Sequence, residues 1–205
     1  MNSQKHCFTQ TDMWSGGFYE LLIELPASQS VGQFLSFLWQ QPQLSGCYHH
    51  RQVEPEQQPL FDAITIPTEG HLYGIATFDD GLSCACGTYT TFFDHEQTWW
   101  IGLYLPLGAL SIYPIGGYPF ETTPQLATVL QNLNAWLYQI AQNLYEHSAF
   151  NIAVIGFDPD ISQTKKIIEQ EIPTERWDGI LISNNTQLLW YPPTIFDKQY
   201  TISHT

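Results

Sequence analysis

Cysteine and histidine residues are the first candidates for chemistry, because their side chains are soft metal ligands. Cys84 and Cys86 are two positions apart in a strand-like run, so both thiols would face the same side of a sheet. Cys47 with His49 and His50 forms a second group. Zinc-binding pairs usually lie on turns, whereas the first pair belongs to a strand-like run. We therefore expect buried, reduced cysteines, no zinc and no disulfide.

The register of a predicted hairpin also argues against a shared metal. The dipeptide Asp80-Gly81 separates two strand-like runs and is typical of a type I′ turn, in which both central residues have positive φ. A two-residue loop would place His71 opposite Thr90. On that register His71 lies about four strand positions, or roughly 13 Å, from Cys86, which is too far for one metal ion.

Four carboxylates could take part in binding or in acid–base chemistry. Asp158 and Asp160 follow an apolar run, where α/β proteins often place a metal ligand or a base, although a turn into a helix explains them equally well. Asp94 and Glu96 flank His95 and could orient its imidazole, but this tract also has the polarity of a loop. The chain has no glycine-rich phosphate loop and no serine elbow. We assign no catalytic residue and keep the four acids as binding candidates.

Adjacent tryptophans suggest an aromatic binding surface. In a strand, Trp99 would share a face with Ile101 and pack on a long helix, whereas Trp100 and Tyr104 would lie on the far face. Gly102 between them would leave a shallow depression for a partner side chain or a flat ligand. The alternative is that another segment covers this face and that Trp100 is structural.

The charge of the chain is strongly acidic, with 6 Lys+Arg against 20 Asp+Glu and a net charge of −14. Residues 52–164 contain no lysine or arginine, so we expect one continuous negative surface there. Direct nucleic-acid binding is not expected, because neutralising phosphates requires those cations. The charge would repel anionic membranes and favour a basic partner, or it would simply keep an aromatic-rich protein in solution.

Apolar segments are too short and too interrupted to cross a membrane. The longest, residues 99–110, is broken by Gly102, Pro106 and Gly108, whereas a spanning helix needs roughly 20 apolar residues. The first residues have no apolar signal segment, and the last ones do not suggest a lipid anchor. We therefore expect a cytoplasmic protein without membrane association.

Hydrophobic periodicity predicts an α+β fold in a single domain, residues 1–205. A helix of about six turns is predicted from Pro124 to His147, with Thr122 or Thr123 as its cap and apolar residues every three or four positions. The other predicted elements are strands at 18–25, 69–79, 82–93, 98–105, 109–115, 151–157, 179–183 and 187–191, and shorter helices at 31–41 and 162–170.

This element order favours a largely antiparallel sheet with one long and two shorter helices packed mainly on one face. Residues 48–68 are expected to form a long surface loop. Residues 1–15 and 193–205 are expected as irregular tails. The order of the strands in the sheet is not readable from the pattern.

The favoured function is a protein-binding module that neutralises a basic partner with carboxylates and aromatic side chains, in the manner of immunity or inhibitor proteins. This comparison is an analogy from charge and size, and no family resemblance is carried by particular residues. The alternative is a small-molecule-binding protein or an enzyme with a pocket between the long helix and the sheet. A homo-oligomer without a catalytic site is a third interpretation. No cofactor is expected.

Overall fold

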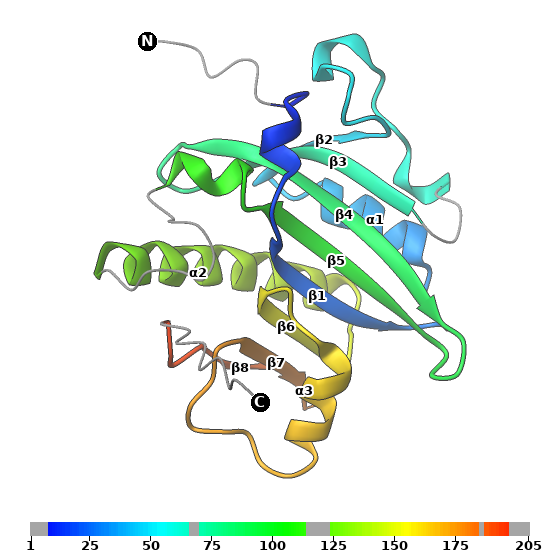
Figure 1. Cartoon of the computed structure of the whole chain (residues 1–205). Helices are drawn as coiled ribbons and strands as arrows, with labels where there is room; N and C mark the ends of the chain where they lie inside the picture. The colour runs from blue at the N-terminus through cyan, green and yellow to red at the C-terminus, as the bar shows by residue number, and fades with distance from the viewer. Residues whose placement is uncertain (1–7, 66–69, 114–123, 185–186, 197–205) are drawn as a thin grey trace, which may run out of the picture.

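Strands from most of the chain form a single antiparallel sheet, in the order β2-β3-β4-β5-β1-β6-β7-β8 (Figure 1). The computed structural model describes residues 8–65, 70–113, 124–184 and 187–196. The elements in these residues are the strands β1 (Phe18–Pro26), β2 (Leu44–Tyr48), β3 (Gly70–Thr77), β4 (Ser83–Phe93), β5 (Thr98–Pro106), β6 (Ile152–Phe157), β7 (Gly179–Ser183) and β8 (Leu188–Tyr191), and the helices α1 (Val31–Trp39), α2 (Pro124–His147) and α3 (Ile161–Ile168). The predicted α+β fold with an antiparallel sheet is confirmed.

The first strand in the sequence, β1, lies in the middle of the sheet, between β5 and β6. All its residues except the two at its ends are buried, so both faces of the strand are covered. Leu21 and Ile23 contribute to the main core, whereas Leu22 belongs to a second, smaller apolar cluster. This division follows from the alternation of side chains along a strand. A strand buried on both faces requires other elements to cover each of them.

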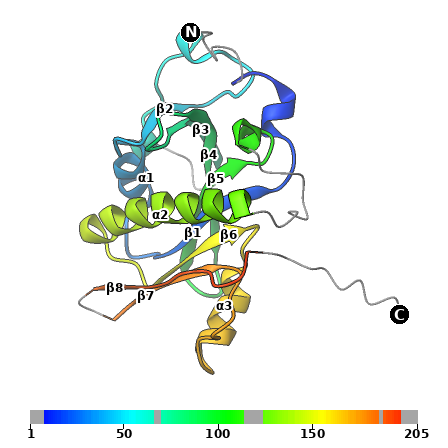
Figure 2. The ribbon, with the colours of Figure 1, turned by 90° about the vertical axis from the view of Figure 1, so that its left-hand side faces the viewer.

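One face of the sheet, which we name the helix face, is covered by α1 and α2, and α3 lies on the opposite, far face (Figure 2). Helix α1 begins after Ser30, whose hydroxyl accepts a hydrogen bond from the Gln33 backbone amide at 3.3 Å. Helix α2 buries an apolar stripe at helical spacing: Leu126, Leu130, Leu133, Leu137, Ile140 and Leu144. Its expected cap residues, Thr122 and Thr123, lie outside the described residues.

The far face is covered by two separate segments. Helix α3 begins at the cap residue Asp160 and packs Ile161 with Leu22 and Val154. A 3₁₀ turn, η1 (Thr11–Trp14), lies on the same side of the sheet (Figure 2), and the Trp14 ring is 5.2 Å from that of Tyr73 on β3. Residues 8–15 therefore do not form the irregular tail that was expected.

Two elements differ from the sequence prediction. Residues 109–112 form a 3₁₀ helix, η4 (Ala109–Ile112), instead of a strand, because both edges of β5 are already paired and no strand edge is free beside it. Strand β2 was not predicted, because its sequence LSGCY contains a bulge with positive φ at Gly46 and Cys47. It pairs with β3 at the edge of the sheet.

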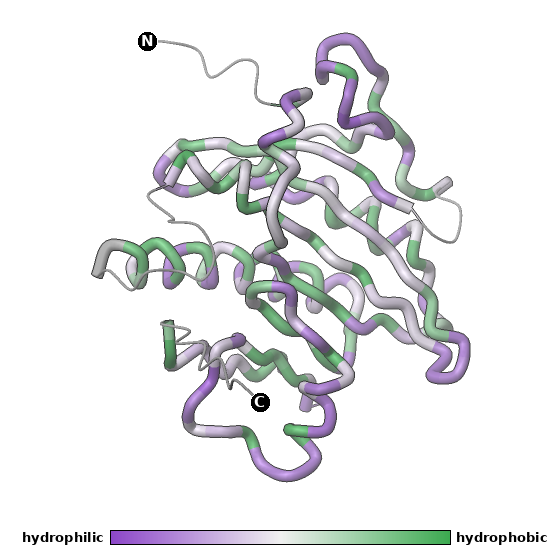
Figure 3. The backbone as a smooth tube through the Cα atoms, viewed as in Figure 1, coloured by the Kyte–Doolittle hydropathy of each residue, from purple (hydrophilic) through white to green (hydrophobic). Residues whose placement is uncertain are grey.

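The hydropathy of the residues agrees with this arrangement of a covered sheet and exposed connections. In Figure 3 the central strands are coloured mainly white to hydrophobic green, whereas the β4–β5 turn and the loop after β2 are mainly hydrophilic. That loop, expected as irregular surface chain, holds two short 3₁₀ turns, η2 (Pro55–Gln57) and η3 (Ala63–Thr65). The second of them packs closely on α1, where a Cβ atom added to Gly32 would be 2.6 Å from the Ile64 carbonyl oxygen.

Lys165 on α3 holds the helix to the far face of the sheet. Its ammonium group forms ion pairs with Glu24 of β1 and, at 2.7 Å, with Glu96 in the β4–β5 turn. Glu24 is only 5% exposed, and it has no other cation near it among the described residues. A buried carboxylate without a cation is strongly destabilising, so Lys165 stabilises both the helix position and the central strand.

We expect Lys165→Met to lower the free energy of unfolding by about 3 kcal/mol, because it leaves the Glu24 carboxylate buried without its partner. The control is Lys166→Met, which removes the same charge from the exposed neighbouring residue and should change stability by no more than about 0.5 kcal/mol. Urea denaturation measures both values. Equal losses in the two variants would contradict this role of Lys165.

Candidate functional site

The β3–β4 hairpin closes through a three-residue loop, Asp79-Asp80-Gly81, and not through the predicted two-residue turn. The Phe78 amide donates to the Leu82 carbonyl at 2.9 Å, and the Gly81 amide donates to the Phe78 carbonyl at 2.9 Å. Gly81 has positive φ, whereas Asp80 does not, which excludes type I′. The Asp80 carboxylate accepts a hydrogen bond from the Leu82 amide at 2.9 Å, and this side-chain bond stabilises the longer loop.

The longer loop shifts the register of the hairpin by one residue. His71 lies opposite Tyr89, not Thr90, and Cys86 lies opposite Gly74. Cys84 and Cys86 therefore belong to the core of the helix face, whereas His71 is on the far face. Burial raises the pKa of the Cys84 thiol to about 12. The described part of the chain holds no group of three His, Cys, Asp or Glu side chains that could bind a metal.

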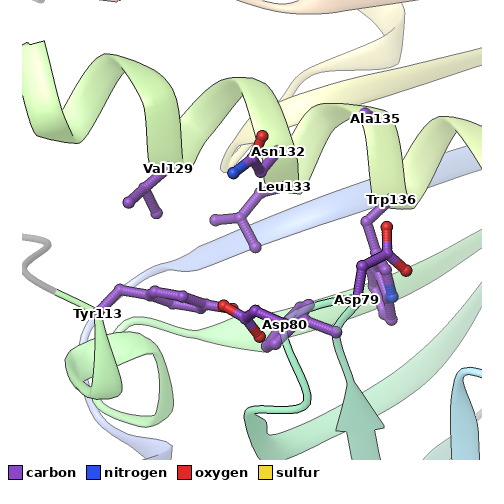
Figure 4. A pocket seen from close by; sticks show the side chains of 9 residues that line it. Asp79, Asp80, Tyr113, Val129, Asn132, Leu133, Ala135 and Trp136 are labelled. Carbon is purple, nitrogen blue, oxygen red and sulfur yellow. The ribbon is translucent and has the colours of Figure 1, made fainter.

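A cavity of about 350 Å³ lies between the tip of this hairpin and α2 (Figure 4). We name it the hairpin pocket. Its described lining residues are Phe78, Asp79, Asp80, Tyr113, Val129, Asn132, Leu133, Ala135 and Trp136. They come from the hairpin tip, from the residue that follows η4 and from about two turns of the long helix. Its volume is within the range typical of ligand pockets.

Three aromatic rings form one wall of the hairpin pocket. The Phe78 ring centroid is 5.0 Å from that of Trp136, at an interplanar angle of 60°. It is 5.5 Å from that of Tyr113, at 62°. The Trp136 indole N–H donates to the Thr77 carbonyl at 3.1 Å, which fixes the end of β3 against α2. The rings are therefore inclined to each other and held by the hairpin and the helix together.

Two carboxylates stand beside these rings. The Tyr113 hydroxyl donates to Asp80 Oδ2 at 2.9 Å, and burial together with this bond raises the pKa of Tyr113. Both Asp80 oxygens thus accept one hydrogen bond each. Asp79 is exposed and makes no hydrogen bond or ion pair with the residues that the structure describes. Its side chain lines the hairpin pocket together with Trp136 (Figure 4).

The side of the hairpin pocket that α2 contributes is mostly apolar. Val129 is partly buried and Leu133 is buried, while Asn132 and Ala135 are exposed at the rim. No lysine or arginine is among the described lining residues. The pocket therefore combines aromatic and aliphatic walls with negative charge, a combination that suits a cation carrying an apolar body.

A second group of titratable residues lies on the far face around Glu20, which sequence reasoning missed. Glu20 on β1 is 4% exposed, and its Oε2 has no hydrogen-bond partner. Burial raises the pKa of Glu20 from 4.5 to about 8, while a hydrogen bond from Tyr89 lowers it and the charge of Asp158 raises it. The carboxyl group is therefore largely protonated at neutral pH. The position of Glu20 within the apolar run of β1 is the sequence feature from which its burial and raised pKa could have been predicted.

The depression expected beside Gly102 does not exist, because the Tyr89 ring occupies it. A Cβ atom added to Gly102 would lie 2.3 Å from that ring. Tyr104 is buried over Gly87 and packs on Phe18, at 4.6 Å between ring centroids. The alternation of faces was predicted correctly, but a cross-strand tyrosine fills the space that glycine leaves.

Trp100 is partly buried, and its ring packs against other apolar side chains. Its ring is 4.2 Å from that of Phe93, and it packs on the small apolar cluster under α3. The indole nitrogen is buried and makes no hydrogen bond with the described residues. Trp100 and Tyr104 therefore do not form the open aromatic surface that was expected, and the alternative, a structural role for Trp100, describes the contacts better.

The four candidate carboxylates lie at two separate places. Asp94 accepts a hydrogen bond from the Gln97 side chain at 3.1 Å, and Glu96 pairs with Lys165, which lowers the pKa of Glu96. Asp158 has positive φ and accepts from the Phe18 amide at 2.9 Å, and Asp160 caps α3. Each thus has a local structural partner, and they do not converge on one site.

No protein-family model matches the chain, and no curated protein or solved structure matches it. Among the described residues, no helix has the length and apolar character needed to cross a membrane. The functional argument therefore depends on the geometry of the hairpin pocket.

We expect Glu20 to make stability depend on pH. Between pH 4.5 and about 8 the unfolded chain has lost this proton and the folded chain keeps it. The free energy of unfolding therefore falls as pH rises, by at most about 1.4 kcal/mol per pH unit from this group, and the contribution is constant outside that range. Glu20→Gln should reduce this slope in urea denaturation measured from pH 5 to 9.

The control for this measurement is Glu146→Gln, a substitution at an exposed carboxylate near the end of α2. It should leave the slope as it is in the unmodified protein. A Glu20→Gln protein with the unmodified slope would show that Glu20 titrates normally in the folded state.

Proposed function

We propose that the protein binds a basic partner protein and that the hairpin pocket receives a cationic side chain of that partner. One observation carries this proposal. The Asp79 carboxylate, which has no partner among the described residues, lines the same cavity as three aromatic side chains. A cation placed there gains both the charge of the carboxylate and the attraction of the ring faces.

The charge balance of the chain supports the same function. A net charge of −14 raises the rate of encounter with a basic partner. Within the described residues, the one ion pair of a lysine or arginine with a carboxylate of residues 52–164 is that of Lys165 with Glu96. Most carboxylates in the described part of this stretch therefore have no lysine or arginine partner among the described residues.

The continuous negative surface expected for residues 52–164 stays a prediction. Asp80 and Asp94 lie at opposite ends of β4, an 11-residue strand, and are thus roughly 35 Å apart. No carboxylate lies within that strand. We therefore base recognition on the local charge of the hairpin tip, with the remaining acids contributing long-range attraction.

A second candidate function is the binding of a small organic cation in the same pocket. The cavity volume of about 350 Å³ favours it, because a pocket of this size can enclose most of a small ligand. Both candidates describe a cytoplasmic binding protein and not an enzyme. The surroundings of Asp94, His95 and Asp158, considered above for acid–base chemistry, contain no second cavity among those described.

We expect a lysine-rich peptide to bind the unmodified protein with an affinity that falls as salt is added. Asp79→Asn should weaken this binding about tenfold, because it removes the carboxylate that is free to pair with the ligand. Calorimetric titration at low and moderate salt measures both effects.

The matched control is Glu146→Gln, which changes the net charge by the same amount near the other end of α2. It should weaken binding less than twofold. Equal effects of the two substitutions would show that only overall charge matters, and the absence of any peptide binding would overturn the proposed function.

A further inference from the structure

The polar ends of the aromatic side chains in the hairpin pocket are already occupied. The Trp136 N–H donates to the Thr77 carbonyl, and the Tyr113 hydroxyl donates to Asp80. Phe78 has no polar atom. These three side chains therefore have no donor left for a ligand. Tyr113 is partly exposed, whereas Phe78 and Trp136 are 7% and 4% exposed and present only a small part of their rings to the cavity.

The free acceptors of the pocket are few. Each Asp80 oxygen already accepts a hydrogen bond, from the Leu82 amide or from the Tyr113 hydroxyl. A guanidinium group binds best to a carboxylate whose two oxygens are both free, a condition that Asp79 meets and Asp80 does not, so the arginine peptide is a necessary competitor in the tests below. An unmodified ammonium group needs three acceptors to replace its water. Asp79 is the carboxylate without a described partner, and this one carboxylate cannot accept hydrogen bonds from all three N–H groups of an ammonium ion.

An alkylated ammonium group matches these walls better. Its methyl groups spread the positive charge over an apolar surface, and it has few or no N–H groups to satisfy. Methyl groups can contact the rings and the aliphatic side chains of Val129 and Leu133, while the charge remains close to Asp79. The Trp136 and Tyr113 rings are inclined by 60° and 62° to the Phe78 ring and pack on it, so the parts that line the cavity differ in orientation.

We propose that the hairpin pocket is a binding site for alkylated ammonium groups, with Phe78, Tyr113 and Trp136 as its aromatic walls and Asp79 as its counter-charge. This inference rests on the proposed function and narrows the cation that the pocket selects. The group can belong to a free quaternary amine or to a methylated lysine side chain of a protein. The recognition chemistry is the same in both cases.

The first test compares choline with its uncharged carbon analogue, 3,3-dimethylbutan-1-ol, by calorimetric titration of the unmodified protein. The two molecules have nearly the same shape, so their difference in affinity reports the charge. We expect choline to bind at least tenfold more tightly. Equal binding would overturn the inference, because it would show a cavity that selects only for apolar shape.

The second test locates the site with ring-removing variants and tetramethylammonium as the probe. Tyr113→Leu should weaken binding at least tenfold, because it removes one aromatic wall. The control is Tyr138→Leu, which removes a half-buried tyrosine of α2 whose ring centroid is 5.1 Å from that of Trp190 on β8. It should weaken binding less than twofold. Equal losses in the two variants would overturn the assignment to this pocket.

The third test distinguishes a free quaternary amine from a methylated lysine side chain as the source of the cation. It also distinguishes the proposed protein partner from the proposed site for alkylated ammonium groups. Peptides that carry trimethyllysine, lysine or arginine at one central position are titrated against the unmodified protein. Preference for trimethyllysine supports both proposals. Tighter binding of the lysine or arginine peptide would support a basic protein partner and would overturn the assignment of the pocket to alkylated ammonium groups. Binding of choline without binding of any peptide supports the inference and overturns the protein partner.

Discussion

Burial of β1 on both faces is the constraint on which the rest of the structure depends. The strand lies in the centre of the sheet, so α2 must cover one side and α3 the other. The same burial takes two carboxylates, Glu20 and Glu24, out of water. The cost of burial is offset in two ways: Glu24 forms an ion pair with Lys165, whereas Glu20 retains its proton near neutral pH. The position of α3 and the pH dependence of stability thus have one origin.

The position of α2 over the helix face also creates the hairpin pocket. The helix extends beyond the central strands to the tip of the β3–β4 hairpin, where the Trp136 indole bonds to the Thr77 carbonyl. The three-residue loop then places Asp79 and Asp80 beside the helix, and η4 places Tyr113 next to them. The cation recognition that we propose would use this meeting of three elements, which are distant in the sequence.

Local pattern predicted those elements whose residues carry their own signals. The long helix and the two hairpin strands follow from periodicity and turn residues. Strand β2 and the 109–112 turn could not be predicted, because a bulge and the lack of a free strand edge determine them. The hairpin pocket was expected only as a pocket between the long helix and the sheet. Its residues depend on the loop length at Asp80, which Tyr113 and Leu82 help to stabilise.

The most direct measurement of the central claim is a crystal structure of the protein with tetramethylarsonium, a heavier analogue of tetramethylammonium whose arsenic atom is located by anomalous scattering. The account predicts one arsenic site in the hairpin pocket, within about 6 Å of the ring centroids of Phe78, Tyr113 and Trp136 and on the side of Asp79. Arsenic bound at other acidic places, such as the β4–β5 turn, with none in the pocket, would contradict it.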